Sequence, residues 1–183
     1  MIRERLAQLG QSVAALDRDL SGRMRIREGN RWMRLGALVF AHLGDSPLWA
    51  AISAIAYWRG DARLRAAVIL MAAAVILAAV LNFGIKNLVR RPRPGGYSPW
   101  LYSRSMDQHS FPSGHAARVG AVAVTLSAAY PSLWPAAVIC ALGVAAARVA
   151  LGAHYLGDVA FGLLIGGLVG VGCVLALAPL LAR

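Results

Sequence analysis

Three short polar segments of this sequence hold residue types that can bind and attack a phosphoryl group. They are Lys86 with Arg93-Pro94, the run Pro112-Ser113-Gly114-His115, and Arg148 with His154 and Asp158. His154 and Asp158 are four residues apart, so they would share one face of a helix. A carboxylate one turn from an imidazole takes its N–H, fixes the tautomer and leaves the other nitrogen free to attack. The third segment therefore predicts a nucleophilic histidine.

The other two segments supply positive charge and amide donors. Pro and Ser are typical of a helix start, and the unpaired amides of a first turn attract anions. The run 112–115 thus predicts a phosphate cradle with His115 beside the anion, or alternatively a plain helix cap. The basic cluster 86–94 predicts a cationic clamp, or alternatively a flank that anchors a membrane helix at the interface.

The acidic residues are too few for a multi-metal site. Beyond Asp61 the chain has two acids, Asp107 and Asp158, and no Glu. Hard divalent cations are usually held by several carboxylates or other oxygen ligands. We therefore expect anion chemistry that uses no metal and no cofactor. Among eighteen arginines there is a single lysine, Lys86, which favours a position that needs a compact ammonium group.

Long apolar runs predict a membrane protein. The chain is 58% hydrophobic and 15% charged, and the runs 66–85 and 159–182 are each long enough to cross a bilayer. The runs 116–130 and 133–147 are shorter, and 35–58 is broken near Asp45 and Pro47, which predicts either one bent span or a re-entrant pair. The fold class is all-α, a polytopic bundle of about five to six helices. Glycines 162, 166 and 170 favour close helix contact.

The N-terminal segment differs from the rest of the chain. Over residues 1–30 the apolar residues recur at three- and four-residue steps, which predicts an amphipathic helix: Ile2, Leu6, Leu9, Val13, Leu16 and Leu20. Up to Arg34 the segment holds eight arginines against four acids, a net charge of +4. Such a helix lies on an anionic lipid surface or packs on the membrane domain, which we assign to residues 31–183. The basic residues cluster at the ends of apolar runs, which argues against nucleic acid as a partner.

The predicted topology brings the three polar segments together. Two membrane crossings separate the loops 91–112 and 149–157, so both loops lie on one side of the bilayer. A positive-inside count favours the cytoplasmic side, but Lys86, Arg90, Arg91, Arg93 and Arg148 are next to the site, so the sidedness stays open.

Together these motifs resemble the type 2 phosphatidic acid phosphatase (PAP2) superfamily of membrane lipid phosphatases. The family signature is a lysine with Arg-Pro after six residues, then Pro-Ser-Gly-His, then Ser-Arg with His and Asp downstream; residues 64–181 carry the matches. Ala147 replaces the serine before Arg148, which removes a hydroxyl near the phosphate. The resemblance implies a haloperoxidase-like helical core.

The resemblance also implies roles for individual residues. His154 attacks phosphorus, Asp158 orients the His154 ring, and His115 is the general acid. The phosphate is bound by the remaining signature residues: Lys86, Arg93, Ser113, Gly114 and Arg148. Arg118 lies outside the signature, and it either reaches the phosphate or a headgroup or pairs with Asp107 or Asp158.

The implied function is hydrolysis of a lipid phosphomonoester or diphosphate through a phosphohistidine, in a bacterial inner membrane. Prenyl diphosphates such as undecaprenyl diphosphate are favoured. Phosphatidic acid, phosphatidylglycerol phosphate and a prenyl-phosphoryl sugar phosphate follow. The alternative is a non-catalytic membrane protein that binds or carries anionic lipid, in which His154 and Asp158 would have no task. Soluble acid phosphatases and haloperoxidases of the same superfamily are disfavoured by the apolar runs. The oligomeric state stays open.

Overall fold

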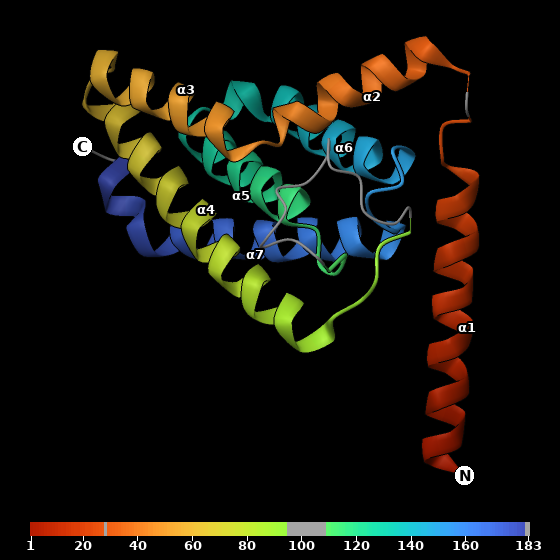
Figure 1. Ribbon diagram of the computed structural model, residues 1–183. Coiled ribbons are helices and arrows are strands. Elements are labelled where there is room, and N and C mark those ends of the chain that lie inside the picture. The colour runs from red at the N-terminus through yellow and green to blue at the C-terminus, as the bar shows by residue number, and fades with distance from the viewer. Residues whose placement is uncertain (28, 95–108, 182–183) are drawn as a thin grey trace.

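A computed structural model describes residues 1–27, 29–94 and 109–181, and in these residues the chain is helical with no strand (Figure 1). This confirms the all-α fold class. The elements are α1 (Ile2–Arg23), α2 (Arg31–Leu43), α3 (Ser46–Arg59), α4 (Ala62–Val89), α5 (Gly114–Ala129), the short 3-10 helix η1 (Pro131–Leu133), α6 (Trp134–Ala150) and α7 (Leu156–Leu181).

In the described part of the chain, three helical stretches are long and apolar enough to cross a membrane, namely Ala62–Val89, Pro131–Ala150 and Leu156–Leu177. The run 35–58 forms α2 and α3, which are bent by 53° at their break and count together as a fourth candidate, either a broken span or a re-entrant loop. Asp45 occupies the N-cap position of α3, and Pro47 follows in its first turn. The sequence features that interrupt this apolar run therefore also explain the bend.

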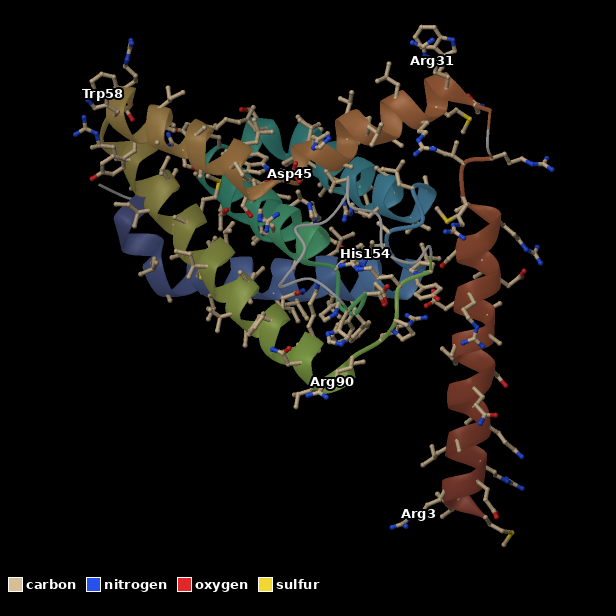
Figure 2. All side chains as sticks on the ribbon, viewed as in Figure 1. Arg3, Arg31, Asp45, Trp58, Arg90 and His154 are labelled. Atoms are coloured by element: carbon tan, nitrogen blue, oxygen red, sulfur yellow. The ribbon has the colours of Figure 1, made fainter. Side chains whose placement is uncertain are left out.

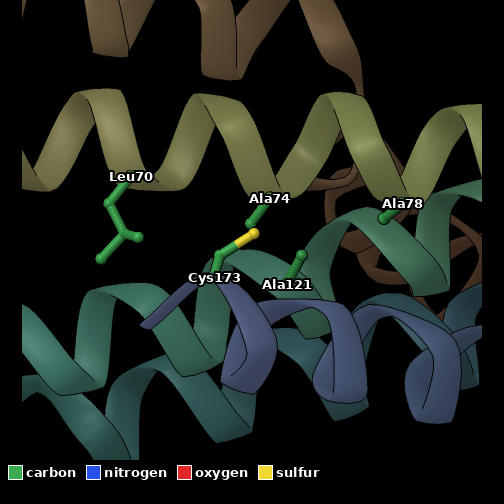
Figure 3. Packing of buried hydrophobic residues seen from close by; sticks show 5 residues of the cluster. All are labelled: Leu70, Ala74, Ala78, Ala121 and Cys173. Carbon is green, nitrogen blue, oxygen red and sulfur yellow. The ribbon is translucent and has the colours of Figure 1, made fainter. Parts of the chain in front are cut away.

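Small side chains let the spans pack closely. Figure 3 shows Leu70, Ala74 and Ala78 of α4 facing Ala121 of α5 and Cys173 of α7, and all five are buried. Alanine at most of these positions allows the helix backbones to approach each other, as is usual in lipid, where large apolar side chains gain little by leaving the bilayer.

Glycines bring α7 closest to α5. A Cβ on Gly166 would lie 1.9 Å from the carbonyl oxygen of Ala117, and one on Gly162 would lie 2.5 Å from that of Ser113. At both positions only a hydrogen fits between the helices. The glycine spacing noted in the sequence therefore marks the α5–α7 contact, which sets the relative position of the starts of these two helices.

The N-terminal helix α1 lies apart from the bundle. It runs across the direction of α7 at the end where α7 begins, and its own N-terminus projects well beyond the other helices (Figure 1). The helix ends at Arg23, inside the segment 1–30 that the sequence singled out. The division into this segment and a membrane domain of residues 31–183 stays a prediction.

Candidate functional site

The three polar segments come from the end of α4, the start of α5 and the loop between α6 and α7. His154 lies in that loop, two residues before α7 begins, and it is 1% exposed. Figure 2 shows His154 near the end of the bundle that α1 adjoins. Within the described residues, these segments are tied to each other by hydrogen bonds that fix the geometry of the site.

The His154 imidazole is held in one tautomer by a backbone carbonyl. Its Nδ1 lies 2.7 Å from the carbonyl oxygen of Ser110, while the nearer oxygen of Asp158 is 3.6 Å away. A carbonyl only accepts hydrogen bonds, so Nδ1 carries the proton and Nε2 keeps its lone pair. We had expected Asp158 to take this proton from a shared helix face. His154 precedes the helix instead, and Ser110 is the partner within hydrogen-bond distance.

The second ring nitrogen of His154, Nε2, faces a guanidinium group. Nε2 lies 3.3 Å from Nη1 of Arg93, and the same Nη1 donates to the carbonyl oxygen of Ala153 at 3.0 Å. An anion that approached Nε2 would therefore meet Arg93 at once. This geometry combines a nucleophile with a cation at one point, as phosphoryl transfer requires.

Asp158 is fully buried and joins several parts of the site. Its Oδ1 accepts from Arg91 Nη1 at 2.8 Å, and its Oδ2 accepts from the Tyr155 amide at 2.8 Å. Its backbone carbonyl accepts from the Ser113 amide at 3.0 Å. This last bond ties the start of α7 to the start of α5. It also commits the Ser113 amide, which leaves the Ser113 hydroxyl and the Gly114 amide as donors for an anion.

Two further cations are buried beside these groups. Lys86 is 6% exposed near the end of α4, and Arg148 is 2% exposed near the end of α6. The carbonyl of Arg148 also accepts from the amides of Ala153 and His154, at 2.9 and 3.2 Å, so the end of α6 shapes the loop that presents the histidine. Gly152 in this loop has a φ of +70°, which favours glycine.

The start of α5 forms one wall of a cavity of about 190 Å³ between α4 and α5. Ser113 caps the helix by accepting from the Ala116 amide at 3.4 Å. The polar lining comprises Asn82, Lys86, Gly114, His115 and Arg118, and the apolar lining comprises Val75, Ala79 and Phe83. Four of the predicted site residues therefore share one cavity, with an apolar wall that continues along a membrane-spanning helix.

His115 is held by the break between α2 and α3. Its Nε2 lies 2.9 Å from Oδ1 of Asp45, and the other oxygen of Asp45 lies 2.7 Å from Nδ1 of His42. Arg118 donates to the carbonyl of Gly44 at the same break. The break between α2 and α3 therefore positions both His115 and Arg118, and Arg118 also lines the cavity between α4 and α5.

Sequence reasoning missed Ser110, Asp45 and Asn82, and it placed Arg91 next to the site without giving it a partner. Ser110, Arg91 and Asp45 contact His154, Asp158 and His115 directly. Asn82 is 4% exposed, and its Nδ2 has no hydrogen-bond partner among the described residues. The sequence could have indicated Asn82 as a site residue, because it is the one polar residue of the apolar run 66–85. Among the described residues there is also no group of three or more His, Cys, Asp or Glu that could hold a metal.

Comparisons with known proteins agree with this arrangement. The family model described as "PAP2 superfamily" matches residues 67–180. Lipid A 1-phosphatase of Rhizobium etli is 34% identical over 99 residues, which cover 51% of this chain and 43% of that protein. Decaprenylphosphoryl-5-phosphoribose phosphatase of Mycolicibacterium smegmatis is 34% identical over 128 residues, 69% of each chain.

A solved structure has a similar fold over most of the chain. The transmembrane PAP2 type phosphatidylglycerolphosphate phosphatase of Bacillus subtilis superposes with a TM-score of 0.70 at 28% identity, over 88% of this chain and 84% of that one. The chain spans less than half the length of the lipid A 1-phosphatase that it matches. Together with the apolar helices, these relatives identify an integral membrane protein of bacterial type.

Proposed function

Because the chain belongs to the PAP2 superfamily, we propose that it is a membrane phosphatase that removes phosphate from a lipid without a metal ion. The observation that carries the proposal is the His154 ring: Nδ1 donates to the Ser110 carbonyl, and the unprotonated Nε2 lies 3.3 Å from Nη1 of Arg93. A buried imidazole in this state is a nucleophile with a cation already beside it.

The reaction follows from these positions in two steps. Nε2 of His154 attacks phosphorus, the bond from phosphorus to the leaving oxygen breaks, and His115 gives that oxygen a proton. The phosphohistidine is then hydrolysed by water, whose proton His115 takes, and inorganic phosphate leaves. Arg93, Lys86 and Arg148 neutralise the phosphoryl oxygens, most strongly in the transition state.

The remaining residues support these two histidines. The Gly114 amide and the Ser113 hydroxyl donate to the phosphoryl group at the start of α5, where the first-turn amides favour an anion. Asp158 stabilises the start of α7 and, from 3.6 Å, the positive charge that develops on His154. Arg118 lines the cavity near the phosphate and contacts the headgroup.

The substrate class is a lipid that carries a phosphate at the membrane surface. The relatives are named as phosphatases of lipid A, of a decaprenylphosphoryl sugar phosphate and of phosphatidylglycerol phosphate. We therefore place glycolipid and glycerolipid phosphomonoesters first, and keep undecaprenyl diphosphate, which the sequence favoured, as a further candidate. The apolar wall of the cavity, Val75, Ala79 and Phe83, supports an acyl or prenyl chain next to the phosphate.

The test is phosphate release by detergent-purified protein in EDTA. The panel holds phosphatidylglycerol phosphate, a prenyl-phosphoryl sugar phosphate, lipid A, phosphatidic acid and undecaprenyl diphosphate. We expect release that persists in EDTA and is lost in His154→Ala, with unchanged thermal unfolding as evidence that the variant folds. Release that requires a metal, or that survives His154→Ala, would overturn the mechanism. Lipid binding without any release would support the non-catalytic alternative.

A further inference from the structure

The N-terminal helix α1 caps the first turn of α7. The Gly157 amide donates to Oδ1 of Asp17 at 2.8 Å, and the Leu156 amide donates to the hydroxyl of Ser21 at 2.8 Å. The first amides of a helix have no partner within the helix, so another group must satisfy them. Here two residues of α1 serve as caps for a helix that begins 135 residues further along the chain. Ser21 is 3% exposed, which shows how closely the two helices meet.

The same contact reaches the site through Arg91. Its Nη2 lies 2.8 Å from Oδ2 of Asp17, and its Nη1 lies 2.8 Å from Oδ1 of Asp158. The guanidinium also lies 4.0 Å above the ring of Tyr155. Arg91 therefore uses both ends of its planar fork, one for α1 and one for the aspartate next to His154. If α1 moved away, Arg91 would lose the carboxylate that holds its second arm.

The linker that follows α1 packs on the loop that carries His154. The Ile26 amide donates to the carbonyl of Ala150 at 3.0 Å. The guanidinium of Arg25 lies so close to Gly152 that a Cβ there would be 2.4 Å from its Nη2. Arg25 and Arg18 also line a cavity of about 200 Å³, and His154 and Tyr155 are among its other lining residues. The segment after α1 thus closes one side of the site.

Most of α1 lies beyond these contacts and leaves an apolar stripe uncovered. The stripe consists of Ile2, Leu6, Leu9, Val13, Leu16 and Leu20, whose exposed fractions run from 78% at Ile2 to 38% at Leu20. At 3.6 residues per turn, these six side chains fall within an arc of about 80°. Water is a poor environment for such a continuous apolar face, so the stripe requires a covering surface.

The direction of α1 indicates which surface that is. The spans α4, α6 and α7 define the membrane, and α1 runs across α7 at the level where α7 begins (Figure 1). A helix in this position lies parallel to the bilayer surface. Leu16 and Leu20 adjoin Asp17 and Ser21 along the helix, so the stripe borders the face that meets α7. Segment 1–34 has a net charge of +4, which favours anionic headgroups.

We infer that α1 is an interfacial helix that completes the site: its apolar stripe lies in an anionic lipid surface, while Asp17 and Ser21 hold the start of α7 and, through Arg91, Asp158. The location of α1 is independent of the reaction, whereas its effect on turnover rests on the proposed phosphatase function. Asp17, Ser21 and Arg91 are positioning residues, because they act on the reacting groups through Asp158 and the helix start.

Lipid matters to the site because, among the described residues, the hydrogen bonds and ion pairs that tie α1 to the bundle come from its last turns. A single helix of about twenty residues is only marginally stable in water, and burial of one apolar face in an interface stabilises it. Lipid binding therefore raises the fraction of molecules in which Asp17 meets Gly157 and Arg91. The expected result is a higher turnover number on an anionic bilayer than on a neutral one.

The first experiment locates α1 without measuring activity. In full-length protein with Cys140→Ala and Cys173→Ala, an environment-sensitive fluorophore is attached to Leu9→Cys on the stripe or to Gln11→Cys, nearly opposite on the helix. In vesicles of phosphatidylcholine and phosphatidylglycerol we expect quenching by shallow lipid-borne quenchers at position 9 and little at position 11. Equal quenching at the two positions would overturn the inference. So would shielding at position 9 that depends on protein concentration, which indicates a second copy.

The second experiment measures turnover of p-nitrophenyl phosphate, a soluble ester whose supply does not depend on lipid. Leu9→Ser with Val13→Ser disrupts the stripe, and Gln8→Ser with Gln11→Ser is the matched control on the polar side. We expect kcat to fall about tenfold or more in the stripe variant and in Asp17→Ala, with KM nearly unchanged, because positioning is lost rather than binding. The control should keep the wild-type kcat.

Combining the changes tests whether the stripe and Asp17 act together. If both act through the same contact, Asp17→Ala should cost little further kcat once the stripe is disrupted. Losses that multiply, or a stripe variant with wild-type kcat on anionic vesicles, would overturn the inference. A wild-type protein that releases no phosphate from any substrate would instead refute the proposed function, and the fluorophores would still report where α1 lies.

Discussion

Gly166→Ala tests how α5 and α7 hold the site together. A Cβ on Gly166 would lie 1.9 Å from the Ala117 carbonyl oxygen and 2.9 Å from the Ala121 nitrogen, and real Cβ contacts stay above 3.0 Å. The helices must therefore separate by at least 1.1 Å (3.0 − 1.9) at this point. The obstacle is backbone, so no side-chain rotation relieves it.

The separation would reach the site because both helices start there. The Ser113 amide and the Asp158 carbonyl are 3.0 Å apart, and a shift of that size at Gly166 is enough to break their hydrogen bond. A misplacement of about 1 Å costs up to ~100-fold in rate. Overpacking of this kind costs about 1–3 kcal/mol in the free energy of unfolding, which lowers Tm by roughly 2–12 °C for a chain of this size.

The assay compares Gly166→Ala with Gly167→Ala, whose added Cβ meets no atom within 4 Å. Both variants gain the same methyl group and the same helix propensity, so they differ only in what the methyl meets. Turnover of a lipid substrate and thermal unfolding in detergent are measured side by side. If Gly166→Ala kept the Tm and the turnover of Gly167→Ala, the reasoning from the α5–α7 contact would be refuted.

Three further predictions follow from contacts at the site. Asp45→Asn should lower kcat/KM for an alkyl phosphate about tenfold, yet lower kcat/KM for p-nitrophenyl phosphate much less. Asp45 holds His115, kcat/KM reports formation of the phosphohistidine, and in that step only the alkyl leaving group needs the proton of His115. Asn82 lines the cavity between α4 and α5, so Asn82→Leu should raise the KM for lipid substrate. The Tm should stay level or rise, since the change removes a buried amide nitrogen that has no hydrogen-bond partner among the described residues. Gly143→Ala should lower Tm by a few degrees without changing kcat, because its Cβ meets the Phe40 ring at 2.4 Å, and a side chain can move aside where backbone cannot.

Each of these has an outcome that contradicts it. Equal slowing of both esters in Asp45→Asn would remove Asp45 from the proton step. A lower Tm with an unchanged KM in Asn82→Leu would make that amide structural. A loss of turnover in Gly143→Ala would mean that the α2–α6 contact is coupled to the site.

Much of the fold could be predicted from the sequence because its signals are local. The long runs 66–85 and 159–182 give α4 and α7, which are long and apolar enough to cross a membrane, and the glycines at 162 and 166 lie where α5 touches α7. The interruption at Asp45 appears as a break bent by 53°. Hydropathy and helix breakers act within a few residues, so a single sequence records them.

The sequence indicates which residue types the candidate site uses, and their roles stay predictions, but it does not indicate most of the groups that hold them in place. The signature residues Lys86 and His154 stand out because charge is rare in an apolar chain. The partner of the His154 ring is the backbone carbonyl of Ser110, and any residue type there would offer the same group. Asp17 meets Gly157 across 140 residues, and such a pairing depends on how α1 crosses α7, which no local pattern specifies.

The length of α5 has a consequence for which molecules the site can reach. Its 16 residues rise about 24 Å, less than the ~30 Å of hydrocarbon in a bilayer. The cavity at its start extends from Lys86 to Val75 on α4, about 16 Å along a helix of the membrane interior. A phosphate bound at Gly114 lies at one end of this cavity, and its lipid tail follows the apolar wall formed by Val75, Ala79 and Phe83. Phosphate esters dissolved in water have no such tail, so the site favours lipid-linked substrates over soluble ones.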